Sequence, residues 1–235
     1  MGARRDASEF ARGGTRLQAE IVALIPVNRL DRAKGRLASL LEPGQRRELF
    51  LATLRTVVEA ATAAGTEPVI LTADAEVAGC LPGVRILDED PACSGLSAQI
   101  ESALGRIGPP PGGVLILHAD LPLATAEAIG RLVAAATAGE SVTLVRSGDG
   151  GTNAMLLRPP GRFALAYGQD SFAQHESAAR AAGLAVTIVD EPRLSLDIDT
   201  PADLEALSRD PAAADSPAGR VIAGWGGRFP RVHGA

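Results

Sequence analysis

The sequence predicts an α/β protein in which a mostly parallel, mixed sheet is covered by helices on both faces. Short apolar segments, each four to six residues long, alternate with segments of helical period along residues 21–208. This alternation favours parallel strands joined by crossover helices. The chain has 235 residues, of which 46% are hydrophobic and only 3% are aromatic. That length suffices for one large core, which must be built mainly from Ala, Val, Leu and Ile.

Seven short apolar segments are predicted to be strands. Pro26 ends the first of them, and four consecutive apolar residues (VLIL) form the fourth, which stops at His118. A loop with three glycines, residues 147–152 (SGDGGT), separates the fifth from the sixth. In chain order the predicted strands cover residues 21–25, 68–72, 84–87, 114–117, 141–145, 154–157 and 184–189.

Segments with apolar residues at helical spacing separate these strands. Pro43 suits the first turn of the first helix and Gly65 suits its end. Thr125 can cap the helix that follows the fourth strand, and Thr200 and Asp203 have the spacing of a capping box. In chain order the predicted helices cover residues 43–64, 94–107, 125–138, 171–182 and a short segment that begins at 201.

The two ends of the chain are predicted to lie outside the folded domain. Residues 1–19 are polar, contain arginine and glycine, and show no periodicity, which indicates a disordered leader. Residues 210–235 are rich in Pro, Ala and Gly and are expected to form a flexible tail. Neither an internal repeat nor a linker divides the middle of the chain, so residues 20–209 are expected to form a single domain.

Charge, hydropathy and cysteine content restrict the class of protein. A formal net charge of −5 disfavours binding to nucleic acid, and no apolar stretch reaches the length of a membrane span. The arginines near the start are not followed by an apolar stretch, so no signal peptide is indicated. Cys80 and Cys93 are too few for a disulfide framework. We therefore predict a cytoplasmic protein without nucleic-acid or membrane partners, of a composition that is also compatible with a homodimer.

Carboxylates follow two apolar segments that lie far apart in the sequence. Asp120 comes directly after residues 114–117, and Asp197 and Asp199 follow the last predicted strand. Open α/β sheets bind ligands in the crevice outside the carboxyl ends of their strands, and paired carboxylates are the usual ligands of Mg²⁺ beside a phosphate. We predict that Asp120 and Asp197 bind Mg²⁺. Asp199 fits either a metal ligand or the cap of the final helix.

A basic segment follows the first predicted strand, where doubly wound folds place nucleotide phosphates. Lys34 and Arg36, with Gly35 between them, offer a point charge, a planar guanidinium and close approach of the backbone. The segment matches neither the Walker A pattern nor GxGxxG. It fits a phosphate-binding loop and a solvated basic loop before a helix equally well.

Two glycine-containing turns are candidates for binding an anion. Residues 150–153 (GGTN) combine two glycines with the hydroxyl of Thr152, and residues 168–171 (GQDS) lie where a helix begins. A turn followed by an Asp or Ser cap explains the second candidate without any ligand. His118 is expected to line the end of its strand and His175 to lie within a helix, so neither is assigned a chemical role.

Taken together, these segments resemble the guanylyltransferases of coenzyme F420 biosynthesis. The similar segments run in order over about residues 21–208. HADLP and DIDTPADL also occur in the broader group of nucleotidyltransferases, whereas the combination of GTNA with YGQDSFAQH is more specific. The segments are IPVNRLDRAKGRL (25–37), SGLSAQI (94–100), HADLPL (118–123), GTNAMLLRP (151–159), YGQDSFAQH (167–175) and LDIDTPADL (196–204).

This resemblance implies a Rossmann-like nucleotidyltransferase fold and a reaction. GMP would pass from GTP to a small phosphorylated three-carbon acid, phosphoenolpyruvate or 2-phospho-L-lactate, with release of pyrophosphate. The composition, rich in Ala, Arg and Gly, suggests a bacterial protein and thereby favours phosphoenolpyruvate. The roles implied by the resemblance are these: Lys34 and Arg36 face the GTP phosphates and are catalytic, Thr152, Gly168 and Ser171 bind the acid, and Asp120 and Asp197 hold Mg²⁺.

Three segments depart from the usual pattern of that family. The family usually reads GTGTN where this chain has DGGTN (149–153), so one threonine is missing and an acid, Asp149, has entered. Ser97 stands where an asparagine is common, and Asn28 stands where a lysine is frequent. Two alternatives to the implied function are kept. One is a molybdenum-cofactor guanylyl- or cytidylyltransferase, whose bulky pterin acceptor needs no small-anion site. The other is a catalytically inactive nucleotide-binding module.

Overall fold

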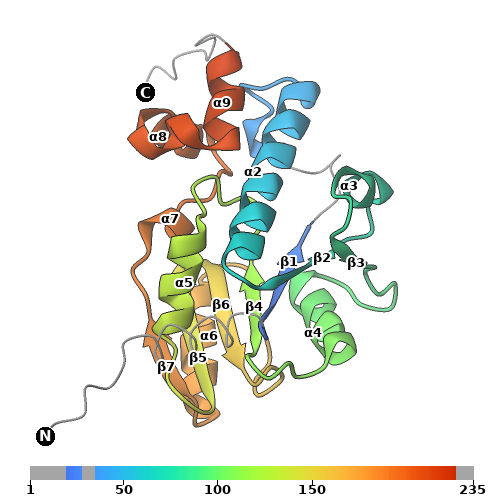
Figure 1. Cartoon of the computed structure of the whole chain (residues 1–235), viewed down its shortest axis with the longest axis vertical. Coiled ribbons are helices and arrows are strands. Elements are labelled where there is room, and N and C mark those ends of the chain that lie inside the picture. Colours follow the sequence, from blue (N-terminus) through green and yellow to red (C-terminus); the bar gives the residue numbers. More distant parts are fainter. Residues whose placement is uncertain (1–19, 28–34, 226–235) are drawn as a thin grey trace, which may run out of the picture.

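Seven strands form one mixed sheet in the computed structural model, which describes residues 20–27 and 35–225. The strands are β1 (Val22–Pro26), β2 (Glu67–Leu71), β3 (Arg85–Leu87), β4 (Val114–Leu117), β5 (Ser141–Arg146), β6 (Thr152–Arg158) and β7 (Ala185–Ile188). Their order is β3-β2-β1-β4-β6-β5-β7. Only β6 runs antiparallel to its neighbours, β4 and β5. The predicted α/β class with a mostly parallel, mixed sheet is confirmed (Figure 1).

Helices cover both faces of this sheet. They are η2 (Gly35–Leu37), α2 (Pro43–Ala63), α3 (Ala75–Cys80), α4 (Leu96–Ile107), α5 (Ala126–Ala134), α6 (Ser171–Ala181), α7 (Pro192–Ser195), α8 (Pro201–Arg209), η3 (Pro211–Asp215) and α9 (Pro217–Gly224). α2, α3, α5 and α7 bury apolar side chains against one face, and α4 and α6 against the other. Within the part of the chain that the structure describes, no helix is long and apolar enough to cross a membrane.

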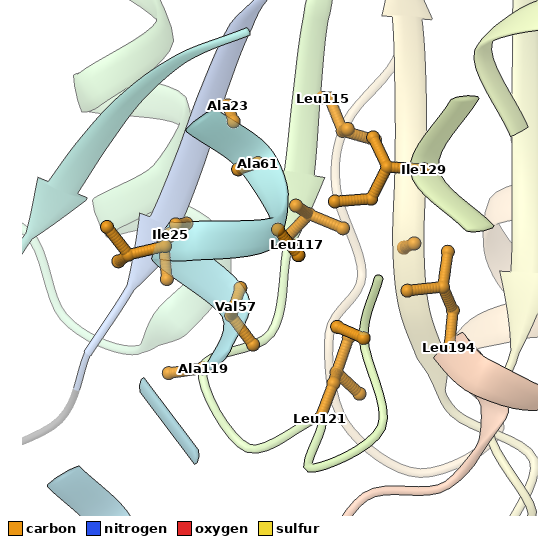
Figure 2. Close-up of a cluster of buried hydrophobic side chains, with 14 of the residues drawn as sticks. Ala23, Ile25, Val57, Ala61, Leu115, Leu117, Ala119, Leu121, Ile129 and Leu194 are labelled. Atoms are coloured by element: carbon orange, nitrogen blue, oxygen red, sulfur yellow. The ribbon is translucent and has the colours of Figure 1, made fainter. Parts of the chain in front are cut away.

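The central strands are buried on both sides because successive side chains of a strand point to opposite faces. In β1, Ala23 and Ile25 enter the cluster under α2 and α5, whereas Val22 and Leu24 enter the cluster under α4 and α6. The unbroken apolar segments of the sequence follow from this two-sided burial. Figure 2 shows the first cluster, in which the strand and loop residues Ala23, Ile25, Leu115, Leu117, Ala119 and Leu121 meet the helix residues Val57, Ala61, Ile129 and Leu194.

The strand order changes direction between β1 and β4. The chain places β2 and β3 on one side of β1 and then crosses to put β4 on its other side. In open α/β sheets this is where ligands bind, outside the carboxyl ends of the strands. Because β6 is reversed, its first residues lie at the same edge: Ala154 pairs with Leu117, and the amide of His118 donates to the carbonyl of Asn153 at 3.0 Å.

Two short helices were not expected from the sequence. α3 has six residues and α7 has four, which is too few to show a helical period. Both begin at a side-chain cap, because Asp74 accepts a hydrogen bond from the amide of Glu76 and Glu191 accepts one from the amide of Arg193.

The predicted flexible tail is wrong over residues 210–225. Here η3 and α9 form and pack, together with α8, against the start of α2. Prolines open both helices and Ser216 caps α9, so the composition that suggested a tail instead supplies helix starts. Ala218 and Ile222 are buried, and the indole nitrogen of Trp225 donates to the Glu48 carboxylate at 3.2 Å. Residues 226–235 and the predicted leader, residues 1–19, lie outside the described residues.

Packing of α9 predicts a measurable contribution to stability. Ile222→Ala is expected to lower the free energy of unfolding by about 2–4 kcal/mol, because a side chain that is only 6% exposed leaves a cavity. The measurement is urea denaturation followed by circular dichroism. Arg209→Ala, at an exposed residue of α8, is the control and should change stability by less than about 0.5 kcal/mol. Equal stability of Ile222→Ala and the unmodified chain would contradict the packing of α9.

Candidate functional site

A cleft of about 890 Å³ opens at the carboxyl ends of β1 and β4. This volume is in the range of small-molecule and cofactor pockets. Its walls come from the residues after each of these strands and from the loop that leads into α4. They include Pro26, Val27, Arg36, Glu89, Cys93, Ser94, Gly95, Leu96, Gln99, His118, Ala119, Asp120 and Asp199.

Gln99 in α4 holds the loop that forms one wall of the cleft. Its amide oxygen accepts from the backbone amide of Asp90 at 2.8 Å, and its amide nitrogen donates to the carbonyls of Asp90 at 2.8 Å and Cys93 at 2.9 Å. Gln99 is buried, so these bonds are shielded from water. The sequence showed this residue only as part of a helix, because its partners are loop backbone groups.

Three carboxylates gather at the rim of the cleft. Asp120, Asp197 and Asp199 each offer an oxygen, and these oxygens lie within 4.8 Å of one another. The backbone brings the two segments together, since the amide of Ile198 donates to the carbonyl of Asp120 at 3.2 Å. The structure therefore brings together the predicted pair, Asp120 and Asp197, and adds Asp199 to it. We call these three residues the acidic cluster.

Asn153, at the start of β6, anchors the acidic cluster to the sheet. Its side-chain amide donates to the carboxylate of Asp197 at 3.1 Å and to the carbonyl of Ser195 at 3.0 Å. Burial, followed by repulsion from Asp120, raises the pKa of Asp197 to about 6, although the bond from Asn153 acts in the opposite direction. Sequence reasoning included Asn153 in a glycine turn but gave it no role of its own.

Asp199 is not the cap of the final helix. Thr200 caps α8, because its hydroxyl accepts from the amide of Asp203 while the Asp203 carboxylate accepts from the amide of Thr200 at 2.7 Å. The predicted capping box is thus confirmed. The interpretation of Asp199 as a cap is therefore wrong. Its carboxylate lies in the acidic cluster, and its role as a metal ligand stays a prediction.

The acidic cluster fits a hard divalent cation. Half-buried carboxylate oxygens at this spacing are the ligands that Mg²⁺ and Mn²⁺ prefer. Burial contributes most to the raised pKa of Asp197, and repulsion from Asp120 and, less strongly, from Asp199 adds to it. A cation between them would relieve that repulsion.

The basic segment is described only in part. Arg36 lies in η2 and lines the cleft with an exposed side chain, and its predicted contact with a nucleotide stays a prediction. Its charge also contributes to the lowered pKa of Asp149. Lys34, its predicted partner, and Asn28 lie outside the described residues.

Thr152, Gly168 and Ser171 come together where α6 meets β6. Thr152 is the first residue of β6 and Ser171 the first of α6, and their hydroxyl oxygens lie 3.4 Å apart. Gly168 lies in the turn before α6 with a φ of 141°, a conformation that favours glycine. Asp170 precedes the helix but makes no side-chain cap bond, so a simple cap does not explain this turn. We call Thr152, Gly168 and Ser171 the cradle.

The cradle has a buried part and an exposed part. The side chains of Thr152 and Ser171 are only 1% and 2% exposed, whereas Gly168 and the two residues after it are exposed. The hydroxyls therefore hold the cradle together from inside. The exposed turn, at the positive end of the α6 dipole, is the part that can meet an anion.

Asp149 closes the turn between β5 and β6. Its carboxylate accepts from the hydroxyl of Ser147 and from the amide of Gly151 at 3.1 Å, which together hold its pKa below the usual value. A Cβ atom at Gly151 would lie 2.8 Å from the Ser147 hydroxyl oxygen, so a larger residue there would have to displace the side chains that close the turn. The acid that enters the usual GTGTN pattern at Asp149 therefore stabilises this loop.

The two histidines lie in different surroundings. His118 lines the cleft at the end of its strand, as expected. His175 is completely buried in α6, and its Nδ1 lies 3.0 Å from the Thr152 hydroxyl oxygen. The expectation that His175 is merely a helix residue therefore overlooked its contact with the cradle.

The chain is similar to guanylyltransferases over most of its length. Residues 21–209 match the family described as guanylyl transferase, CofC like. Phosphoenolpyruvate guanylyltransferase of Sphaerobacter thermophilus is 40% identical over 199 residues, which are 80% of this chain and 92% of that protein. 2-Phospho-L-lactate guanylyltransferase of Haloarcula marismortui is 40% identical over 202 residues, which are 83% of this chain and 91% of that protein.

Solved structures share the fold at low sequence identity. A protein from Desulfovibrio desulfuricans whose name assigns it to the nucleotide-diphospho-sugar transferases has a TM-score of 0.72 at 15% identity, over 87% of this chain and 94% of that one. A nucleotidyl transferase from Methanothermobacter has a TM-score of 0.57 at 18% identity, over 80% and 95% of the two chains. At these identities the likeness shows a nucleotidyltransferase-type fold.

The raised pKa of Asp197 predicts that cation binding depends on pH. Without a cation, the raised pKa of the Asp197 carboxyl contributes to the free energy of unfolding. This contribution is complete at pH values below the ordinary pKa of 3.8 and is lost as the pH rises through about 6. A cation must displace the proton, so the dissociation constant for Mn²⁺ should rise up to about tenfold per pH unit below about pH 6.

Calorimetric titration of Mn²⁺ between about pH 5 and pH 7.5 measures this dependence. Asp197→Asn should bind Mn²⁺ more weakly and with a flatter pH profile, and Asp190→Asn, outside the acidic cluster, should behave like the unmodified chain. A dissociation constant that is the same across this range would contradict the pKa assigned to Asp197.

Proposed function

Because the chain belongs to the family of CofC-like guanylyl transferases, we propose that it transfers GMP from GTP to a small phosphorylated three-carbon acid. The acceptor that we propose first is phosphoenolpyruvate, and 2-phospho-L-lactate is the alternative. Such a product belongs to coenzyme F420 biosynthesis. The observation that carries the proposal is the adjacency of two sites: Asn153 binds the acidic cluster, and its neighbour Thr152 belongs to the cradle.

The proposed reaction is an in-line displacement at the α-phosphorus of GTP. A phosphate oxygen of the acid forms the new bond to this phosphorus, and the bond to the β-phosphate oxygen breaks, which releases pyrophosphate. The attacking oxygen is already anionic at neutral pH, so no side chain has to remove a proton. The chain then contributes positioning and charge stabilisation, as in phosphoryl transfer generally.

GTP is proposed to occupy the cleft at the carboxyl ends of β1 and β4. Arg36 lines this cleft and would stabilise the charge that develops on the departing pyrophosphate. We propose the same role for Lys34, two residues earlier in the sequence. Leu71 and Leu96 also line the cleft and offer apolar surface for the base.

The acidic cluster is proposed to hold the cation, with Mg²⁺ as the first candidate. Asp120 and Asp199 line the cleft, and Asp197 is fixed by Asn153 on the side of the cradle. A bound divalent cation supplies neutralisation of the phosphate charge. The three carboxylates would thus hold the positive charge of the cation between GTP and the acid.

The cradle is proposed to bind the phosphorylated acid. A small anion with two or more negative charges matches the exposed turn at the start of α6. A bulky pterin acceptor needs no such turn, so the cradle favours the small acid over the molybdenum-cofactor alternative. The complete acidic cluster likewise favours an active enzyme over an inactive nucleotide-binding module.

We also propose a cytoplasmic location, supported by the two free thiols of Cys80 and Cys93, which are typical of a reducing compartment. GTP and the acid are the proposed small-molecule partners. A homodimer stays a prediction of the sequence.

The proposed reaction predicts acceptor-dependent release of pyrophosphate from GTP. With Mg²⁺, release should require phosphoenolpyruvate or 2-phospho-L-lactate and should not occur with a pterin acceptor. Asp120→Asn should lower turnover at least about 100-fold, because the variant loses a proposed ligand of the cation that stabilises the transition state. Asp190→Asn is the matched control and should keep full turnover. Failure of both acids, with GTP consumed in the presence of a pterin, would overturn the proposal.

The cradle predicts a selective loss of acid binding in Thr152→Val. The KM of the acid should rise about tenfold while that of GTP stays within about twofold, because the hydroxyl that joins Ser171 to His175 is lost. Steady-state kinetics with each substrate varied separately measure the two constants.

Thr143→Val is the matched control for this variant. Thr143 is a fully buried threonine of β5 whose hydroxyl has no hydrogen-bond partner among the described residues. The same substitution there should leave both KM values unchanged. An equal rise of both KM values in Thr152→Val would place the acid elsewhere.

A further inference from the structure

We propose that His175 is a positioning residue that joins Thr152 of the cradle to the segment that leads into Gly168, so that the acid-binding turn is held in place before the acid arrives. Thr152 lies on β6, and the segment is Ala166 to Gly168, which leads into α6. This inference rests on the proposed function, because it assigns His175 to the acid site of that reaction.

Each ring nitrogen of His175 contacts one of these two segments. Nε2 lies 2.9 Å from the backbone amide nitrogen of Ala166, and Nδ1 lies 3.0 Å from the hydroxyl oxygen of Thr152. A backbone amide only donates, so Nε2 must be the unprotonated acceptor. In the neutral ring the proton then lies on Nδ1, which donates to Thr152. The geometry therefore fixes the tautomer.

The surroundings of His175 keep its ring neutral. The side chain is completely buried, and burial, followed by the charge of nearby His118, lowers its pKa to about 4. The ring of Tyr167 packs against it edge-on with a centroid separation of 4.8 Å, and Phe163 does so at 6.3 Å. A buried neutral imidazole with both nitrogens in use is a rigid link.

The link controls where the exposed turn lies. After Ala166, the amide of Tyr167 donates to the hydroxyl of Ser97 in α4 at 2.9 Å, so two adjacent amides fix the chain just before Gly168. On the other side, the hydroxyl oxygen of Thr152 accepts a hydrogen bond from Nδ1–H of His175. The hydroxyl oxygens of Ser171 and Thr152 lie 3.4 Å apart, which is long for a hydrogen bond between two hydroxyls. His175 is thus the stronger of the two links from α6 to Thr152.

Three substitutions separate the two contacts. His175→Phe keeps the aromatic packing and removes both hydrogen bonds. His175→Asn keeps a donor near the position of Nδ1, and His175→Gln keeps an acceptor near the position of Nε2, so each is expected to restore part of the link. Phe163→Leu, at a neighbouring ring outside the cradle, is the control.

We expect the KM of phosphoenolpyruvate to change and the KM of GTP to stay nearly constant. His175→Phe should raise the KM of phosphoenolpyruvate about 10- to 30-fold, with the KM of GTP within about twofold, and the Asn and Gln variants should lie between it and the unmodified chain. Phe163→Leu should leave both constants unchanged. A merely structural role would lower thermal stability or turnover without this difference between the two KM values, and that outcome would overturn the proposal.

A double-mutant cycle tests the link itself. If His175 acts through Thr152, the double variant Thr152→Val/His175→Phe should raise the acid KM by less than the product of the two single effects. Fully multiplicative effects would show that the residues act separately. Nitrogen NMR of the unmodified chain gives a second test, since His175 should carry its proton on Nδ1 from pH 8 down to about pH 5. A proton on Nε2 would also overturn the proposal.

These outcomes are distinct from failure of the proposed function. If the unmodified chain releases no pyrophosphate with either acid, the function itself is wrong. If it does so and the His175 variants leave the acid KM unchanged, only the role of His175 is wrong.

Discussion

The constraint on which the site depends is the repulsion among three carboxylates held within 4.8 Å of one another at one edge of the sheet. Burial and the neighbouring charges raise the pKa of Asp197, so the folded chain sustains this arrangement against electrostatic cost. Two contacts maintain it: the backbone bond from Ile198 to Asp120 and the amide of Asn153. A bound divalent cation would relieve this repulsion, and on that expectation the proposed phosphate chemistry depends.

The antiparallel strand β6 brings Thr152 and Asn153 to that edge of the sheet. Parallel strands alone place only their carboxyl ends beside the cleft, but the antiparallel β6 adds its first residues there. The register of β5 and β6 shifts at this point: Val145 pairs with Ala154 and Arg146 with Thr152, which leaves Asn153 as an extra residue between the two pairs. At this irregularity Asn153 reaches the acidic cluster, whereas Thr152 contacts His175 of α6. The start of β6 thereby connects a proposed cation site with a proposed anion site.

Several parts of this arrangement were accessible from the sequence, and others were not. The pairing of Asp120 with Asp197 followed from two carboxylates that each come after an apolar segment. The five-residue gap between β5 and β6 is too short for a crossover helix, so the reversal of β6 was also encoded. The contact of His175 with Thr152 was not, because the residues are 23 positions apart and no local pattern links them. The packing of α9 was hidden by a composition typical of loose segments.

The sequence by itself determined the class of fold, the order of the strands and of the longer helices between them, and the residue types available for chemistry. It did so because hydrophobic period, prolines and glycines act locally along the chain. Only the tertiary structure decided which polar groups meet. In the folded chain Asp199 lies in the acidic cluster and does not cap a helix. Asp149 closes the turn between β5 and β6. His175 is buried between Thr152 and Ala166. Such choices depend on burial and on distances between remote segments, which no local spacing records.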